Sequence, residues 1–265
     1  MNYRDKNTAV ILRFIALDRW KALFGELKNQ SRQDFDQRLG ISAIINAVLI
    51  STIPIIFVFL DTYNTRKTAM HLPTIAFGTC AVMAIWLKWR YKLSHLASTK
   101  NYKELLSLTH TAVAAGCIPA VLLMVFAPEL LTQRRELVTA AASPLASDAP
   151  LSIWALLSSV IIVVLIAAWV AITEETIFRG LLISVIRRAN FFAKQSTNDL
   201  MAVTLSAMLF GLAHYPTWGI IPTIAMLGLG IGFGIAYIAS GERLIFVMIY
   251  HFLFDSLSIL VSLLI

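Results

Sequence analysis

The sequence has too few charged residues for a water-soluble domain. Asp, Glu, Lys and Arg make up only 14% of its 265 residues, whereas an ordinary soluble domain is about 25% charged. Hydrophobic residues make up 58%, and the mean hydropathy is +0.75. The low charge excludes a disordered chain, and the lack of a Gly-X-Y period excludes a collagen-like one. The composition therefore indicates an integral membrane protein.

Cysteine is also scarce, which limits the kinds of site that the chain can build. Cys80 and Cys117 lie inside apolar stretches without a CxxC spacing, so they indicate neither a disulfide framework nor a thiolate metal site. The zinc-protease motif HExxH is missing, and residues 1–38 lack the pattern of a removable signal peptide. No internal repeat is evident. We expect one membrane domain over 39–265, preceded by a cytoplasmic amphipathic helix within 1–38.

Apolar runs fill most of that membrane domain. A helix needs about 20 apolar residues to cross the hydrocarbon core, because its backbone must satisfy its own hydrogen bonds there. The expected fold is therefore an all-α membrane bundle of about seven transmembrane helices. The runs are 39–60, 72–87, 105–127, 151–186, 200–215, 220–239 and 244–265.

The basic residues are distributed unevenly between alternate loops. A net charge of +7 would suggest a nucleic-acid partner in a soluble protein. Here the N-terminal segment and the loops on its side of the membrane hold 17 Lys and Arg, and the opposite loops hold four. The positive-inside rule then predicts a cytoplasmic N-terminus and an outward C-terminus in the plasma (inner) membrane. The lipid bilayer is the expected partner, and no nucleic-acid partner is needed.

Ionisable side chains inside the apolar runs gather in the C-terminal half. Each costs roughly 2.5 to 3.5 kcal/mol at the centre of a membrane helix, so it needs a partner or a water-filled cavity. Such residues indicate function by default. The chemistry is therefore expected within 170–260, at Glu174, Glu175, Arg179, His214, His251 and Asp255.

Helical spacing separates the roles of the two glutamates. Glu175 and Arg179 are four residues apart, so they share a helix face and can form an ion pair that offsets the burial of both charges. Glu174 points about 100° away from Glu175 and has no such partner on its own helix. We therefore expect Glu174 to be the more desolvated carboxylate, suited to holding and deprotonating a water.

The polar turn at 187–198 brings a histidine towards Glu174. If the segments on either side form an antiparallel helical hairpin, Glu174 and His214 lie at similar depth and can face each other. His251 and Asp255 are again four residues apart on a third helix that can reach the same cavity. Together these groups indicate hydrolysis by an activated water, in a cavity open to the cytoplasmic side or laterally to lipid.

Three motifs in this order carry a family resemblance. Glu174 to Arg179 matches EExxxR, Phe210 to His214 matches FxxxH, and His251 to Asp255 matches HxxxN except at its last residue. The set resembles the CPBP family of intramembrane glutamic endopeptidases, which includes the type II CAAX prenyl proteases and bacterial Abi proteins. The resemblance covers about 150–260.

The resemblance implies a role for each matching residue, without a cofactor or metal. Glu174 and His214 would position and activate the water, and His251 with residue 255 would stabilise the oxyanion. Glu175 and Arg179 would hold the site in shape, and Phe210 would shape the pocket. Asp255 departs from the usual Asn: its carboxylate could be protonated, could orient His251, or could mark a changed activity, because an ionised carboxylate repels an oxyanion.

The expected activity is that of an intramembrane endopeptidase acting on a membrane-associated peptide or protein. A prenylated CAAX-like protein is one candidate substrate. Two alternatives remain open: a zinc hydrolase that uses His214, His251 and either Asp255 or Glu174 as ligands, and a transporter or a non-enzymatic immunity or scaffold protein. A further interpretation concerns Gly228, Gly230, Gly232 and Gly234, which indicate close helix packing rather than phosphate binding.

Overall fold

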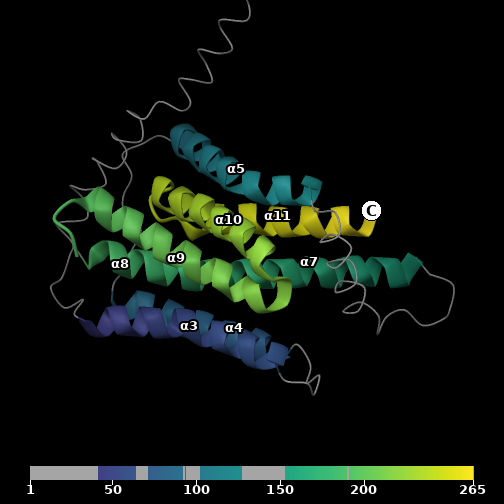
Figure 1. Ribbon diagram of the computed structural model, residues 1–265, viewed down its shortest axis with the longest axis horizontal. Helices are drawn as coiled ribbons and strands as arrows, with labels where there is room; N and C mark the ends of the chain where they lie inside the picture. Colours follow the sequence, from purple (N-terminus) through teal and green to yellow (C-terminus); the bar gives the residue numbers. More distant parts are fainter. Residues whose placement is uncertain are drawn as a thin grey trace, which may run out of the picture.

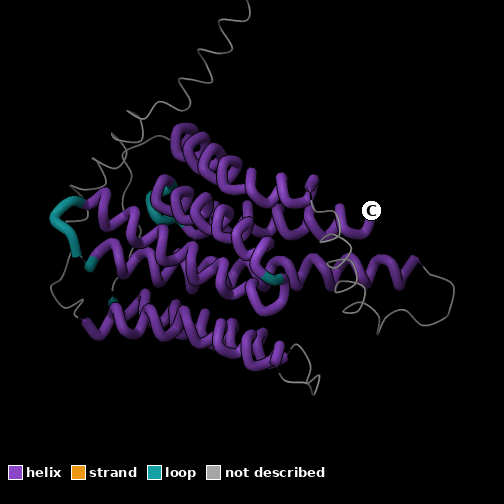
Figure 2. Tube along the Cα trace, in the orientation of Figure 1, coloured by secondary structure: helices purple, strands orange, loops and turns teal. Residues whose placement is uncertain are grey.

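The computed structural model describes residues 41–63, 71–91, 93, 102–126, 153–189 and 191–264, and these residues form an all-helical bundle. The predicted amphipathic helix within 1–38 lies outside the described residues. Figures 1 and 2 show the helices running in roughly one direction, with α5 on one flank and α3 and α4 on the other. The elements are α3 (Ile41–Tyr63), α4 (His71–Arg90), α5 (Tyr102–Phe126), α7 (Ile153–Glu175), η2 (Thr176–Ile183), α8 (Ser184–Arg188), α9 (Gln195–Trp218), α10 (Ile220–Ala239) and α11 (Leu244–Leu264).

Each predicted apolar run corresponds to one helical rod. Elements α7, η2 and α8 follow one another without a break and form a single rod over 153–188. Four helices of the described part of the chain are long and apolar enough to cross a membrane, and two shorter apolar helices accompany them. The four are Ser42–Asp61, Val160–Arg188, Gln195–Trp218 and Ile220–Ala239, and the two are Leu106–Leu122 and Leu244–Ile259.

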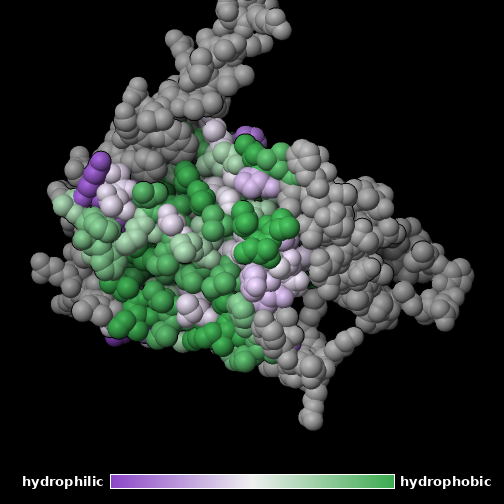
Figure 3. Space-filling view, viewed as in Figure 1, coloured by the Kyte–Doolittle hydropathy of each residue, from purple (hydrophilic) through white to green (hydrophobic). Residues whose placement is uncertain are grey.

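The outer surface of the bundle is apolar, as an integral membrane protein requires. Large hydrophobic side chains are half exposed along most helices, for example Leu165 at 62% and Ile224 at 60%. Figure 3 shows hydrophobic residues covering most of the described surface on that face. Such a surface cannot face water over this area without aggregating, so lipid is its solvent.

Glycines allow α10 to approach two helices closely. A Cβ at Gly232 would lie 2.7 Å from the Cα of Gly116 on α5, and one at Gly230 would lie 3.0 Å from the Cα of Ala207 on α9. A Cβ at Gly228 would likewise meet Pro119 of α5, and a Cβ at Gly234 would meet Val203 of α9. The predicted packing role of this glycine run is therefore confirmed. One pair of glycines four residues apart faces α5 and the other pair faces α9.

One local feature was not predicted. The chain from Thr176 to Ile183, directly after the two glutamates, is a π-helix in which all eight residues are buried. π-helical stretches are rare and are frequently found at functional sites. This part of the rod contacts α3, α4, α9, α10 and α11 and is therefore central in the bundle.

Candidate active site

Glu174 and His214, which are predicted to hold a water molecule, both line the same cavity. Glu174 at the end of α7 and His214 near the end of α9 are both part of the wall of a cavity of about 260 Å³. The helical hairpin predicted from the turn at 187–198 thus brings them to the same depth. The remaining wall consists of Val58, Pro73, Thr74, Phe77, Trp169, Val170, Thr173, Ala213, Thr217 and Trp218.

The carboxylate of Glu174 is buried and only partly engaged. The residue is 8% exposed and Glu175 is 0% exposed, so the prediction that Glu174 is the more desolvated of the two was wrong. Oε2 of Glu174 nevertheless has no hydrogen-bond partner. Nε2 of His251 lies 3.8 Å from Oε2 of Glu174, beyond hydrogen-bond length. A buried carboxylate oxygen without a partner is costly, so this atom is available to hold a water in the cavity.

The ring of His214 is fixed by its own helix. Its Nδ1 lies 2.8 Å from the carbonyl oxygen of Phe210, and because a carbonyl can only accept, Nδ1 carries the hydrogen. In the neutral ring Nε2 is then the acceptor. The Phe210 ring lies 4.9 Å from the His214 ring, which restricts its rotation further.

A buried ion pair lies behind the cavity. Nη1 of Arg179 is 2.9 Å from Oε1 of Glu175, and both side chains are completely buried, so the pair predicted from the i, i+4 spacing is present. Arg179 also donates to the carbonyl oxygen of Gly230 at 3.4 Å. Its guanidinium carbon lies 4.4 Å from the centre of the Phe210 ring, within the range of a cation–π interaction.

His251 connects this ion pair to the cavity residues. Its Nδ1 lies 2.7 Å from Oε1 of Glu175, and its Nε2 lies 3.4 Å from Oδ2 of Asp255. Both ring nitrogens therefore face carboxylates. His251 and Asp255 lie beside Glu174 but are not part of the cavity wall as the structure has it.

Phe233 is a site residue that the sequence analysis missed. It lies within the glycine run of α10, is completely buried, and its ring lies 5.1 Å from that of His251. The guanidinium of Arg179 lies 5.5 Å from the same ring. No signal marks this position, because a phenylalanine in an apolar helix is ordinary and only the packing of α10 brings it to the ion pair.

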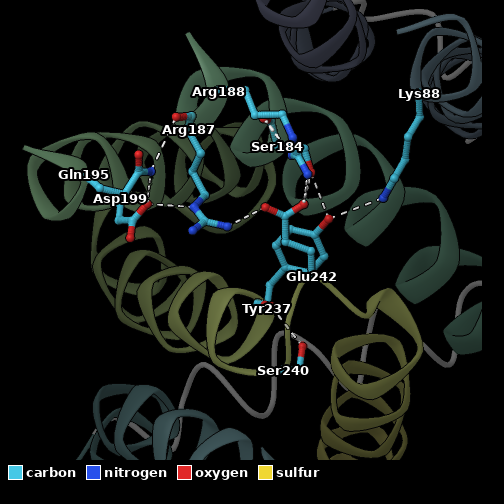
Figure 4. Close-up of polar contacts among 9 residues, drawn as sticks. All are labelled: Lys88, Ser184, Arg187, Arg188, Gln195, Asp199, Tyr237, Ser240 and Glu242. Atoms are coloured by element: carbon cyan, nitrogen blue, oxygen red, sulfur yellow. Dashed lines mark hydrogen bonds and ion pairs between the residues drawn. The ribbon is translucent and has the colours of Figure 1, made fainter. Parts of the chain in front are cut away.

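A second polar cluster lies at the C-terminal end of the rod (Figure 4). Arg187 lies between Asp199 of α9 and Glu242 of the α10–α11 turn, and Arg188 donates to Oε2 of Glu242 at 2.8 Å. Lys88 of α4 reaches the hydroxyl of Tyr237 at 3.3 Å. We call these six residues the Arg187 cluster. It ties the ends of α4, α8, α9 and α10 together.

Two groups of this cluster lie outside the apolar runs and have shifted pKa values. Burial by itself raises the pKa of the Glu242 carboxyl, but the guanidinium groups of Arg188 and Arg187 outweigh it and hold that pKa below its usual range. Burial lowers the pKa of Lys88 to about 8, and Glu242 offsets only part of this. Glu242 also has a φ of 62°, a conformation that its ion pairs help to maintain.

No group of three or more His, Cys, Asp or Glu residues is arranged to hold a metal ion in the part of the chain that the structure describes. The two cysteines are free, with Cys80 buried and Cys117 half-buried, and neither belongs to the cavity wall.

Comparison with known proteins supports the family resemblance inferred from the three motifs. No curated protein and no solved structure matches the chain. One family model, type II CAAX prenyl endopeptidase Rce1-like, matches residues 155–257. This segment contains Glu174, His214, His251 and all three motifs. The C-terminal part of this integral membrane protein thus resembles the Rce1-like type II CAAX prenyl endopeptidases.

Proposed function

We propose that this protein is an intramembrane endopeptidase that cleaves a peptide bond of a membrane-associated protein. Similarity to a family of CAAX-type proteases supports the reaction class. The observation that carries the proposal is the meeting of Glu174 and His214, from two helices, in the wall of one cavity, with Oε2 of Glu174 buried and without a hydrogen-bond partner.

In the proposed reaction a water lies between Glu174 and His214. Nε2 of His214 accepts one hydrogen bond from it, and the Glu174 carboxylate removes a proton as the water oxygen bonds to the peptide carbonyl carbon. The C–N bond of the tetrahedral intermediate then breaks, and Glu174 returns the proton to the leaving amine nitrogen. Water and peptide are thereby converted to a carboxylic acid and an amine.

His251 is proposed to stabilise the oxyanion of that intermediate through a hydrogen bond donated by Nε2, which requires a hydrogen on both ring nitrogens because Nδ1 donates to Glu175. Its orientation depends on Glu175, which accepts from Nδ1 and is itself held by Arg179. Asp255 lies beside Nε2 of the ring, where an ionised carboxylate opposes the developing negative charge. We infer that Glu175, Arg179 and Phe210 are positioning residues.

The experiment is cleavage of a diverse peptide mixture, including farnesylated CAAX-like peptides, by the purified protein in lipid, followed by mass spectrometry. We expect Glu174→Gln and His214→Ala to reduce cleavage by about 10² to 10⁴-fold. Lys194→Gln, at the exposed turn before α9, is the matched control and keeps full activity. Cleavage that survives in Glu174→Gln would contradict the proposal.

The same assay separates the alternatives. Loss of cleavage with a chelator, together with stoichiometric zinc in the purified protein, would favour the zinc hydrolase. A cellular phenotype of the wild-type gene that persists in the Glu174→Ala and His214→Ala variants would favour a transporter or scaffold protein.

A further inference from the structure

The helix that carries Glu174 also builds a large part of the cavity wall beside it. Trp169, Val170, Thr173 and Glu174 all line the cavity, because these positions fall within about 140° of the circumference of an α-helix. Trp169 precedes Glu174 by five residues, or about 7.5 Å along the helix axis. An extended peptide rises about 3.3 Å per residue, so a substrate side chain beside Trp169 belongs to a residue within about two positions of the bond cleaved at Glu174.

The wall around Glu174 and His214 is otherwise mainly apolar and aromatic. Three aromatic side chains besides His214 belong to it, one each from α4, α7 and α9: Phe77, Trp169 and Trp218. The buried Thr173 hydroxyl donates to the carbonyl oxygen of Trp169 at 2.9 Å, so its hydrogen is used within its own helix. Among the wall residues that the structure describes, none is Lys or Arg. The wall therefore offers aromatic rings for packing and a single carboxylate.

Trp169 packs against a glycine of the neighbouring helix. A Cβ at Gly78 of α4 would lie 2.7 Å from Cζ2 of Trp169 and 3.2 Å from its Cη2, closer than the ordinary contact distance between carbon atoms. Gly78 is buried, so the indole ring fits here only because this position has no side chain. The ring thus reaches from α7 to α4, and its place in the cavity wall depends on Gly78.

The volume and the charge of the cavity limit what it can bind. Its volume is about 260 Å³, whereas an apolar protein cavity of about 150 Å³ is large enough for benzene and sites for whole small molecules occupy roughly 300 to 1,000 Å³. One aromatic side chain with its adjoining peptide group therefore fits. The Glu174 carboxylate would repel an acidic side chain, and a basic one would pair with it and displace the reacting water.

We propose that Trp169, held in place by Gly78, is a specificity-determining residue of the peptidase. The substrate has a large apolar side chain within two residues of the cleaved bond, and this side chain binds in the cavity against the Trp169 ring. The assignment rests on the proposed peptidase function and names its substrate class. A side chain that fills the cavity also excludes bulk water from the space beside Glu174, which strengthens the electrostatic interactions there.

A series of peptides tests the substrate class. Starting from a peptide that the wild type cleaves, each of the two residues on either side of the cleaved bond is changed in turn to phenylalanine, alanine, lysine or glutamate. We expect kcat/KM to be at least about tenfold higher for phenylalanine than for alanine at one of these positions, and lower for lysine and glutamate than for alanine there. Equal values for phenylalanine and alanine at every position, or efficient cleavage with a charged residue at the position that prefers phenylalanine, would overturn the proposal.

Substitutions test the role of Trp169 itself. We expect Trp169→Ala to remove most of the difference in kcat/KM between the phenylalanine and alanine peptides, with little change for the alanine peptide. Gly78→Ala should reduce the same difference, because its Cβ displaces the indole ring. Trp89→Ala, at a position of α4 that is 78% exposed, is the matched control and keeps the preference. A purely structural role would lower both rates alike, so a preference that is unchanged in Trp169→Ala would overturn the proposal.

Binding in the cavity can be measured without cleavage. In full-length protein carrying Cys80→Ala and Cys117→Ala, Thr217→Cys places one cysteine in an exposed part of the cavity wall, where it reacts with a maleimide. We expect N-acetyl-phenylalanine amide to slow this reaction more than N-acetyl-glutamate amide does, and Trp169→Ala to remove the difference. Equal reaction rates with the two compounds would overturn the proposal. If no peptide is cleaved at all, the peptidase function fails and the substrate class with it, whereas this measurement still decides whether the cavity binds an aromatic side chain.

Discussion

Replacement of Arg179 tests whether the buried ion pair holds the site together. In Arg179→Met the guanidinium is lost while most of the side-chain volume remains. Glu175 is then left as a buried carboxylate whose remaining partner is Nδ1 of His251. Removing one member of a fully buried pair costs about 3 to 5 kcal/mol, and the lost cation–π contact with Phe210 contributes up to about 2 kcal/mol of that. We expect a loss of about 4 kcal/mol in the free energy of unfolding.

The double variant Glu175→Gln/Arg179→Met gives the decisive comparison. It removes both charges, while the Gln amide oxygen still accepts from His251. A buried ion pair replaced by neutral groups of similar volume is often nearly as stable as before, so we expect most of the loss to be recovered. The measurement is the free energy of unfolding in mixed micelles by denaturant titration, with Glu175→Gln completing the cycle.

Arg188→Met is the matched control for this series. Its partner Glu242 keeps the ion pair with Arg187, so we expect a smaller loss of about 1.5 to 3 kcal/mol. The reasoning would be refuted if the double variant lost as much unfolding free energy as the two single variants lose together, because Glu175 and Arg179 would then contribute independently. It would also be refuted if Arg179→Met lost no more unfolding free energy than Arg188→Met.

Three further predictions concern other parts of the molecule. Gly232→Ala should destabilise the bundle by about 1 to 3 kcal/mol, because its Cβ would lie 2.7 Å from the backbone of Gly116; the midpoint of denaturant unfolding measures this. Asp255→Asn should raise kcat about tenfold with little change in KM, because an amide donor replaces a carboxylate beside the oxyanion that His251 binds; initial rates on a cleaved peptide test this. The free energy of unfolding should rise between pH 8 and pH 10.5. The folded protein releases the Lys88 proton near pH 8, whereas the unfolded chain keeps it up to its ordinary pKa of 10.5. Lys88→Met should flatten this rise.

Each of these has an outcome that would contradict it. Ile231→Ala, at a partly lipid-exposed neighbour of Gly232, is the control for the packing prediction, and an equal loss in both variants would show that the close helix contact is not the cause. A fall in kcat in Asp255→Asn would mean that the reaction uses the carboxylate. A rise in stability that is unchanged in Lys88→Met would assign the pH dependence to another group.

The helices and the main members of the candidate site could be predicted from the sequence because both depend on local patterns. Apolar runs define membrane helices by length alone, and all seven correspond to helical rods, with ends that differ by a few residues, as in α9, which begins at Gln195 rather than near 200. Charged residues in such runs are costly enough to stand out individually. The Glu175–Arg179 pair followed from helical spacing within one element, as did the glycine packing of α10.

What the sequence by itself determined was therefore the all-helical membrane fold, the basic side of the bundle and the set of ionisable residues in its core. Only the tertiary structure decided which of them meet and where. The π-helix after Glu175, the contact of Phe233 with His251, and the meeting of Glu174 and His214 in the wall of one cavity all depend on how separate helices pack. Such packing depends on side-chain shape across several helices at once, which the periodicity of one segment does not encode.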